Sequence, residues 1–126
     1  MRILLDTDII IECLKGNNEI MGRLEELHNK GRIISYTPIS IAEVYAGLRK
    51  GEEKKTDELF QAMELLPING KIGQKAGVYL AKFRKSHNLE ITDALIAATA
   101  FINNSFLYTL NQKHYPMSDV KKFVGI

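Results

Sequence analysis

The sequence predicts a three-layer α/β/α fold with a mainly parallel central sheet, and three observations point to it. Short apolar stretches alternate along the chain with longer stretches whose apolar residues recur at helical spacing. The first apolar stretch, residues 3–5, ends abruptly at Asp6, which is typical of a strand covered on both faces. A length of 126 residues with a hydrophobic fraction of 45% suits one domain with one core, residues 1–126.

The first strand should lead directly into a helix. Apolar residues recur at helical spacing after Asp6, and Gly16 can close that helix. A second helix is expected over residues 18–30, and residues 32–36 have the composition of a second strand. Asp6 therefore stands where a strand meets a helix, at the edge where open α/β sheets bind their ligands.

Two further helices should follow the second strand. The pattern from Ser40 to Glu43 is that of a capping box and predicts the start of the third helix, which Gly51 should end. The fourth helix is expected over residues 52–65, before Pro67. These two helices could also bind a partner protein, because they carry apolar residues that serve either the core or an interface: Tyr45, Leu48, Leu59, Phe60 and Met63.

The second half of the chain should begin with a weak strand at residues 66–69. An amphipathic helix is expected over residues 71–86, and a helix that is apolar nearly all round over residues 93–103. Residues 106–110 should form another strand. The chain should close with a loop, a turn and a short apolar piece, at residues 111–117, 118–119 and 123–126.

Composition narrows the range of functions. A net charge of +2 permits an anionic partner without demanding one. The single cysteine, Cys13, excludes an internal disulfide and fits a reducing compartment. Residues 94–102 form the most apolar run, which is far shorter than the roughly 20 residues of a membrane span. We therefore expect a cytoplasmic protein with no membrane partner.

Three acidic residues fall at corresponding places in the expected fold. Asp6 follows the first strand, Glu43 lies in the first turn after the second strand, and Asp93 lies in the first turn of a buried helix. Each has a plain structural explanation when taken alone. Asp6 can cap a helix, Glu43 can complete a capping box, and Asp93 can complement a helix dipole.

Taken together, the three acids indicate a metal site. Strand ends and the following helix starts share one edge of a parallel sheet, so the three carboxylates could converge there. At a spacing of about 5 Å and an effective dielectric of about 20, each pair would repel by roughly 3 kcal/mol. A cation would remove this repulsion, and carboxylates without imidazole or thiolate ligands suit Mg²⁺ or Mn²⁺.

The residues around these acids resemble those of PIN-domain nucleases, above all the VapC-type toxins of toxin–antitoxin pairs. The resemblance rests on four segments in the family's order: LLDTDIII at Asp6, ISIAEVYAG at Glu43, ITDALIAATA at Asp93 and YTLN at Asn111. It implies a magnesium-dependent endoribonuclease that cleaves RNA with activated water and leaves 5′-phosphate and 3′-hydroxyl ends. It also implies a cognate antitoxin protein as partner, and we expect a homodimer.

The resemblance carries over residue by residue. Asp6, Glu43 and Asp93 match the family's acidic metal-site positions, where Asp6 and Asp93 would bind the ion directly and Glu43 directly or through water. The polar positions that support such a site are matched by Thr7, Thr109 and Asn111. The chain departs from the family at His114, where a fourth acid is common, which puts a second metal ion in doubt.

Two other readings compete with this one. Asp6 and Asp8 could imitate the acidic pair of a phosphoacceptor receiver domain, with Thr109 and Lys113 as its later residues. The region LLPING lacks the acceptor aspartate that such a domain needs after its middle strand. The chain could also be a catalytically silent PIN-like module that only binds RNA or protein.

His28 lies on the apolar side of its helix and should be packed rather than catalytic.

Overall fold

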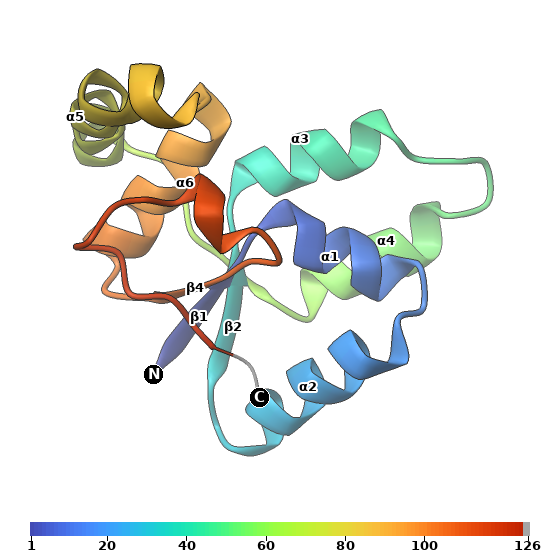
Figure 1. The fold of residues 1–126 in the computed structure, drawn as a ribbon. Coiled ribbons are helices and arrows are strands. Elements are labelled where there is room, and N and C mark those ends of the chain that lie inside the picture. Colours follow the sequence, from blue (N-terminus) through green and yellow to red (C-terminus); the bar gives the residue numbers. More distant parts are fainter. Residues whose placement is uncertain (125–126) are drawn as a thin grey trace.

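Four parallel strands form the centre of the protein in a computed structural model that describes residues 1–124. β1 (Arg2–Leu5) pairs with β2 (Ile33–Tyr36) on one side and with β4 (Phe106–Tyr108) on the other. β3 (Glu64–Leu65) extends the sheet beyond β2, so the strand order is β3-β2-β1-β4. The first strand of the chain thus lies inside the sheet, and the predicted parallel arrangement is confirmed (Figure 1).

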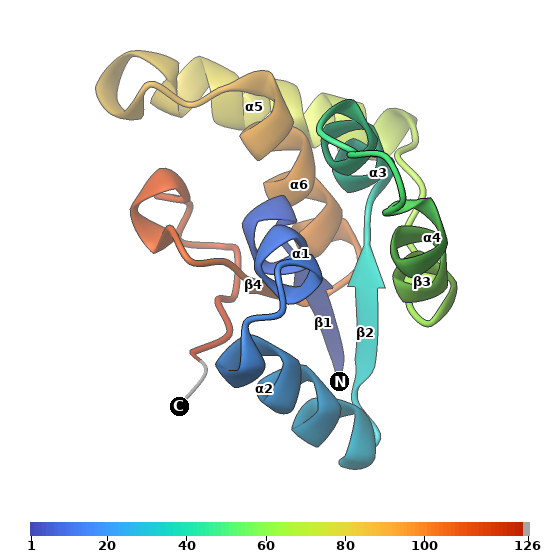
Figure 2. The ribbon, with the colours of Figure 1, turned by 90° about the vertical axis from the view of Figure 1, so that its right-hand side faces the viewer.

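The described residues also form six α-helices and a short 3-10 helix. The α-helices pack in two layers (Figures 1 and 2). One layer contains α5 and α6, and the other contains α1, α2, α3 and α4. The helix bounds are α1 (Thr7–Leu14), α2 (Asn18–Asn29), α3 (Pro38–Ala46), α4 (Glu53–Gln61), α5 (Gly70–His87), α6 (Ile91–Ile102) and η1 (Gln112–His114).

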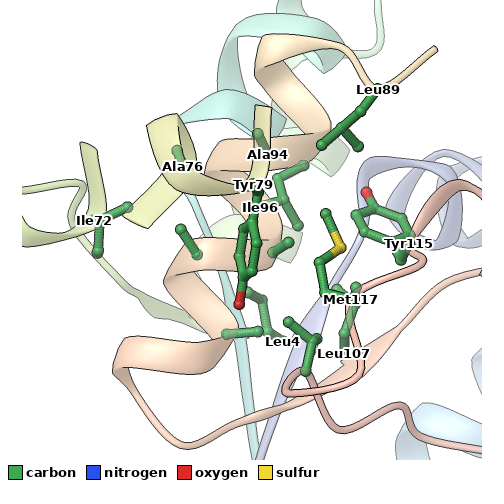
Figure 3. Close-up of a cluster of buried hydrophobic side chains, with 14 of the residues drawn as sticks. Leu4, Ile72, Ala76, Tyr79, Leu89, Ala94, Ile96, Leu107, Tyr115 and Met117 are labelled. Atoms are coloured by element: carbon green, nitrogen blue, oxygen red, sulfur yellow. The ribbon is translucent and has the colours of Figure 1, made fainter. Parts of the chain in front are cut away.

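Alternating side chains of β1 build the two halves of the core. Leu4 faces α5 and α6 in a cluster that also contains Tyr79 and Ile96 (Figure 3). Its neighbours Ile3 and Leu5 belong to the cluster on the other face of the sheet, with residues of α1, α2 and α4. Ile3, Leu4 and Leu5 are each at most 1% exposed, as expected of a strand covered on both faces. The three-layer α/β/α prediction is therefore correct.

The third helix differs from its predicted bounds at both ends. It begins at Pro38, because the Thr37 hydroxyl accepts a hydrogen bond from the Ile39 N–H and proline is well suited to the first turn. The predicted capping box from Ser40 is therefore wrong, and Glu43 lies in the second turn of the helix rather than the first. The helix ends at Ala46 instead of reaching Gly51.

The predicted strand at residues 66–69 is displaced towards the amino terminus. The observed β3 pairs Glu64 and Leu65 with β2, and the Leu66 N–H still donates to the Tyr36 carbonyl at 2.8 Å. Pro67 has no N–H with which to continue the ladder, so pairing stops there. The fourth helix consequently ends at Gln61, before the predicted residue 65.

The carboxyl-terminal part of the chain returns to the sheet after η1. Lys122 forms an isolated parallel bridge with Leu107, and the Phe123 ring packs against Tyr108 with centroids 5.0 Å apart. The predicted apolar piece at residues 123–126 extends beyond the described residues at its last two positions. No helix within residues 1–124 is long and apolar enough to cross a membrane.

Candidate functional site

Asp6 is fixed at the carboxyl end of β1 by three hydrogen bonds to its side chain. Its Oδ1 accepts the Thr7 N–H at 2.8 Å, which caps α1. Its Oδ2 accepts the Thr109 hydroxyl at 2.8 Å and the Tyr115 hydroxyl at 2.9 Å. The Asp6 N–H also donates to the Tyr108 carbonyl at 2.9 Å, which ties this residue to the end of β4. The carboxylate therefore has one defined orientation.

Thr7 links the first strand-to-helix junction to Glu43. The Thr7 hydroxyl donates to Glu43 Oε1 at 2.7 Å, and its oxygen lies 2.8 Å from the Ser40 Oγ. Because the single Thr7 hydroxyl proton goes to Glu43, the Ser40 hydroxyl must donate to Thr7. Ser40 is fully buried and Thr7 is 6% exposed, so this chain of hydroxyls is shielded from water. Glu43 is thus held next to the residue that follows Asp6.

Asp93 lies in the first turn of α6, as predicted, and is partly buried. Burial raises the pKa of Asp93, and the negative charge of Asp6 adds to this increase, although a backbone hydrogen bond from Glu90 opposes it. The exposed His114 lies close enough to lower the pKa of Asp93. Asp6 and Asp93 therefore interact electrostatically, and His114 is near this pair although its side chain is in contact with solvent.

Asp8 adds a further carboxylate to the same edge, although the predicted metal site did not include it. Its Oδ2 accepts the Leu110 N–H at 3.1 Å and lies 3.3 Å from the Thr109 hydroxyl. Its Oδ1 is buried and has no hydrogen-bond partner among residues 1–124. Burial, followed by the charge of Asp6, raises the pKa of Asp8 to about 6. Such an unpaired oxygen in a carboxylate-rich site favours a nearby cation.

The supporting residues differ in how they reach the site. Thr109 contacts Asp6 directly, and Thr7 reaches Glu43. Asn111 is exposed, and its backbone N–H donates to the Thr109 hydroxyl at 3.0 Å. His28 is exposed on α2, so the expectation that it would be packed is wrong; the helix faces the core with Leu27 instead.

These oxygen donors fit a hard divalent cation. Within residues 1–124, no three Asp, Glu, His or Cys side chains lie close enough together to hold a metal ion by themselves. Mg²⁺ does not require such a cage, because it usually keeps several waters and binds one or two carboxylates together with substrate phosphates. Asp6 and Asp93, with the unpaired oxygen of Asp8 nearby, are suitable for this type of binding.

Sequence reasoning missed Tyr115 and considered Asp8 only for the receiver-domain alternative. The Tyr115 side chain is 1% exposed, and burial followed by the charge of Asp6 raises its pKa, so the phenol stays protonated as a donor. No periodicity marks a tyrosine in a loop as a ligand of an aspartate 109 residues earlier. Asp8 did carry a signal, because it stands two residues after Asp6 at the same helix start.

Known proteins resemble this chain in both sequence and structure. A family model described as "PIN domain" matches residues 3–119. The chain is 32% identical over 121 residues to Ribonuclease VapC10 of Mycobacterium tuberculosis, covering 95% of this chain and 90% of that protein.

Two solved structures share the fold over 98% of this chain. One is the crystal structure of VapBC2 from Rickettsia felis bound to a promoter DNA fragment, with a TM-score of 0.81, 25% identity and 98% of that chain covered. The other is a toxin–antitoxin complex from Klebsiella pneumoniae, with a TM-score of 0.74, 26% identity and 99% of that chain covered. The receiver-domain alternative is excluded by these matches. The chain therefore belongs to the PIN domain family and, within it, to the VapC proteins.

Proposed function

We propose that this protein is a magnesium-dependent endoribonuclease and the toxin component of a type II toxin–antitoxin pair. The observation that carries the proposal is the Asp6 carboxylate, which Thr109 and Tyr115 orient within electrostatic reach of Asp93. The 32% identity to a protein named a ribonuclease, over 95% of the chain, supports RNA as the substrate. The activity would be exerted in the cytoplasm.

Asp6 and Asp93 would hold the ion directly, and Glu43 would complete the site directly or through water. Mg²⁺, or Mn²⁺ in its place, would supply activation of a water molecule and stabilisation of charge on the phosphate oxygens. Hydrolysis with departure of the 3′ oxygen leaves 5′-phosphate and 3′-hydroxyl ends. The ribose 2′-hydroxyl is not consumed in such a reaction.

The residues around the acids would keep this arrangement rigid. The Tyr115 and Thr109 hydroxyls both donate to Oδ2 of Asp6. The other oxygen, Oδ1, accepts only the Thr7 N–H, in the cap of α1. Thr7 orients Glu43 through one hydrogen bond. Preorganised polar groups of this kind reduce the reorganisation that a reaction requires.

The antitoxin would bind next to the site, over α1, α3 and the loop that leads into α4. A cavity of about 340 Å³ lies there, lined by apolar residues including Ile11, Leu14 and Leu48, and by Glu43 of the acidic site. A protein segment in this cavity could block the site directly. Complexes between toxins and antitoxins among proteins of this fold support such a partner. A homodimer is also part of the proposal.

Incubation of the purified protein with total RNA, with Mg²⁺ and with a chelator, tests this function. Mapping of the new ends should show 5′-phosphates and 3′-hydroxyls that appear only with the metal. Co-expression of the small open reading frame next to the gene should suppress the cleavage. Binding of RNA without cleavage in any divalent metal would instead indicate a catalytically silent PIN module.

A further inference from the structure

A second cavity, of about 670 Å³, shares no lining residue with the cavity assigned to the antitoxin. It is open to solvent and is lined by the start of α2, by residues 108–113 and by the chain at residues 123–124. The end of the described chain runs beside α2 in both ribbon views (Figures 1 and 2). The volume of this cavity falls within the range of roughly 300–1,000 Å³ that is usual for ligand sites.

This cavity shares residues with the acidic site. Thr109 lines the cavity and donates a hydrogen bond of 2.8 Å to Asp6. Leu110 also lines it, and its N–H binds Asp8 at 3.1 Å. A group bound in the cavity is therefore separated from the carboxylates by a single residue layer. A linear polymer that spans the cavity and the acidic site would place one monomer in the cavity and the next monomer at the carboxylates.

The charges around the two cavities differ. Arg23 and Lys113 outnumber Glu19 at the larger cavity, whereas Lys15 and Arg49 are balanced by Glu43 and Glu52 at the smaller one. Glu19 contacts Arg23 only at 3.8 Å, and the Glu19 side chain is exposed, so the pair has little strength.

An excess of positive charge is needed beside this site, because its carboxylates repel a polyanion. RNA phosphates would gain attraction from Lys113 and Arg23 just where the acids alone would reject them. The balanced cavity near α3 offers no such attraction, which agrees with its assignment to a protein partner.

The walls of the larger cavity also suit a nucleobase. Phe123 is partly exposed along one side and packs on the buried ring of Tyr108, and bases stack on aromatic side chains in single-stranded RNA complexes. Asn111 and Gln112 line the cavity with exposed amide side chains. Each amide carries a donor and an acceptor, the combination that recognises the edge of a base.

We propose that this cavity binds one nucleotide of the RNA next to the scissile phosphate and thereby determines which sequence is cut. Its base lies against the partly exposed Phe123 ring and is recognised by Gln112, while Lys113 and Arg23 bind the adjacent phosphates. The inference rests on the proposed ribonuclease function and adds the place where substrate sequence is read.

The test measures binding of short single-stranded RNA oligonucleotides in a chelator, where binding is separate from metal-dependent cleavage. Lys113→Gln should weaken binding about fivefold and reduce the slope of log affinity against log salt by about 0.7, the value for one lost phosphate contact. Lys54→Gln is the matched control, because Lys54 is exposed on α4, away from the cavity. The control should leave both quantities unchanged.

A second pair of variants tests base recognition. Gln112→Ala should change the ranking of oligonucleotides that differ in a single base, whereas Gln61→Ala, at the exposed end of α4, should not. The inference is overturned if the cavity variants bind and rank the oligonucleotides as their controls do, or if no oligonucleotide binds. Cavity-dependent binding without any cleavage in Mg²⁺ would uphold this inference and refute the proposed nuclease activity.

Discussion

The Tyr115 hydroxyl donates a 2.9 Å hydrogen bond to Oδ2 of Asp6, although 109 residues separate the two in sequence. This bond joins the loop after η1 to the first strand-to-helix junction. It is protected from water, because Tyr115 is 1% exposed. The last part of the chain therefore helps to orient the carboxylate on which the proposed metal site depends.

Tyr115→Phe should lower the cleavage rate about tenfold and leave the fold intact. The change removes only the hydroxyl, so Oδ2 of Asp6 keeps the Thr109 bond but loses its other donor, a net loss of about 1 kcal/mol of stability. Tyr45→Phe is the control, since Tyr45 is a partly exposed tyrosine on α3. Rates and urea unfolding of both variants check the prediction, which fails if the two variants are equally active.

Thr7 should act through the orientation of Glu43 rather than by contact with RNA. Thr7→Val keeps the shape but removes the 2.7 Å donor bond, whereas Thr7→Ser keeps the hydroxyl. We expect Thr7→Val to reduce kcat by roughly tenfold with little change in KM, and Thr7→Ser to restore most of the rate. A Thr7→Ser enzyme as impaired as Thr7→Val would show that packing, not the hydroxyl, matters here.

Asp8 should make the metal-free protein less stable as the pH rises. Burial, followed by the charge of Asp6, raises the pKa of Asp8 from 3.8 to about 6. The folded state therefore holds this proton more tightly than the unfolded state, so the contribution is fully present below about pH 4 and is lost as the pH rises through about 6. Urea unfolding in a chelator should show a smaller stability loss between pH 4 and pH 7 for Asp8→Asn than for the wild type.

Asp57→Asn, an exposed change on α4, serves as the control for this pH series. It should reproduce the pH dependence of the wild type. If Asp8→Asn also retains the full wild-type dependence, Asp8 is not the group responsible.

The interface with the antitoxin can be tested from the toxin side. Ile11 is 37% exposed and lines the cavity between α1 and α3, so Ile11→Asp should weaken antitoxin binding at least tenfold with little loss of stability. Val78→Asp, at a 58% exposed position on α5, is the matched control in the other helix layer. Calorimetry with the purified antitoxin measures both, and equal affinities would place the interface elsewhere.

The sequence predicted the layers of the fold because local patterns encode them. The apolar run that ends at Asp6 and the helical spacing after it are both reproduced in β1 and α1. The start of α3 was misplaced because Ser40 and Glu43 match a capping box locally, whereas both side chains instead join Thr7 through tertiary contacts. Rules that use only neighbouring residues could not show that Ser40 and Glu43 would form these tertiary contacts instead of a capping box.

The site was predicted only as far as strand ends and helix starts define it. Asp6 and Asp93 were singled out because each stands at such a junction. Tyr115 was missed because its role depends on the path of a loop, which no periodicity describes. The Asp8 oxygen without a partner is likewise a result of tertiary burial, since the Leu110 N–H binds the other oxygen of this carboxylate.

The most direct test of the central claim compares wild type and Asp93→Asn in RNA cleavage across a Mg²⁺ titration, with Mg²⁺ binding measured by calorimetry on the same samples. The account predicts cleavage by the wild type that follows Mg²⁺ occupancy, a loss of at least about 100-fold for Asp93→Asn, and weaker Mg²⁺ binding by this variant. Circular dichroism should show that the variant remains folded. A folded Asp93→Asn protein that cleaves RNA at the wild-type rate would contradict the account.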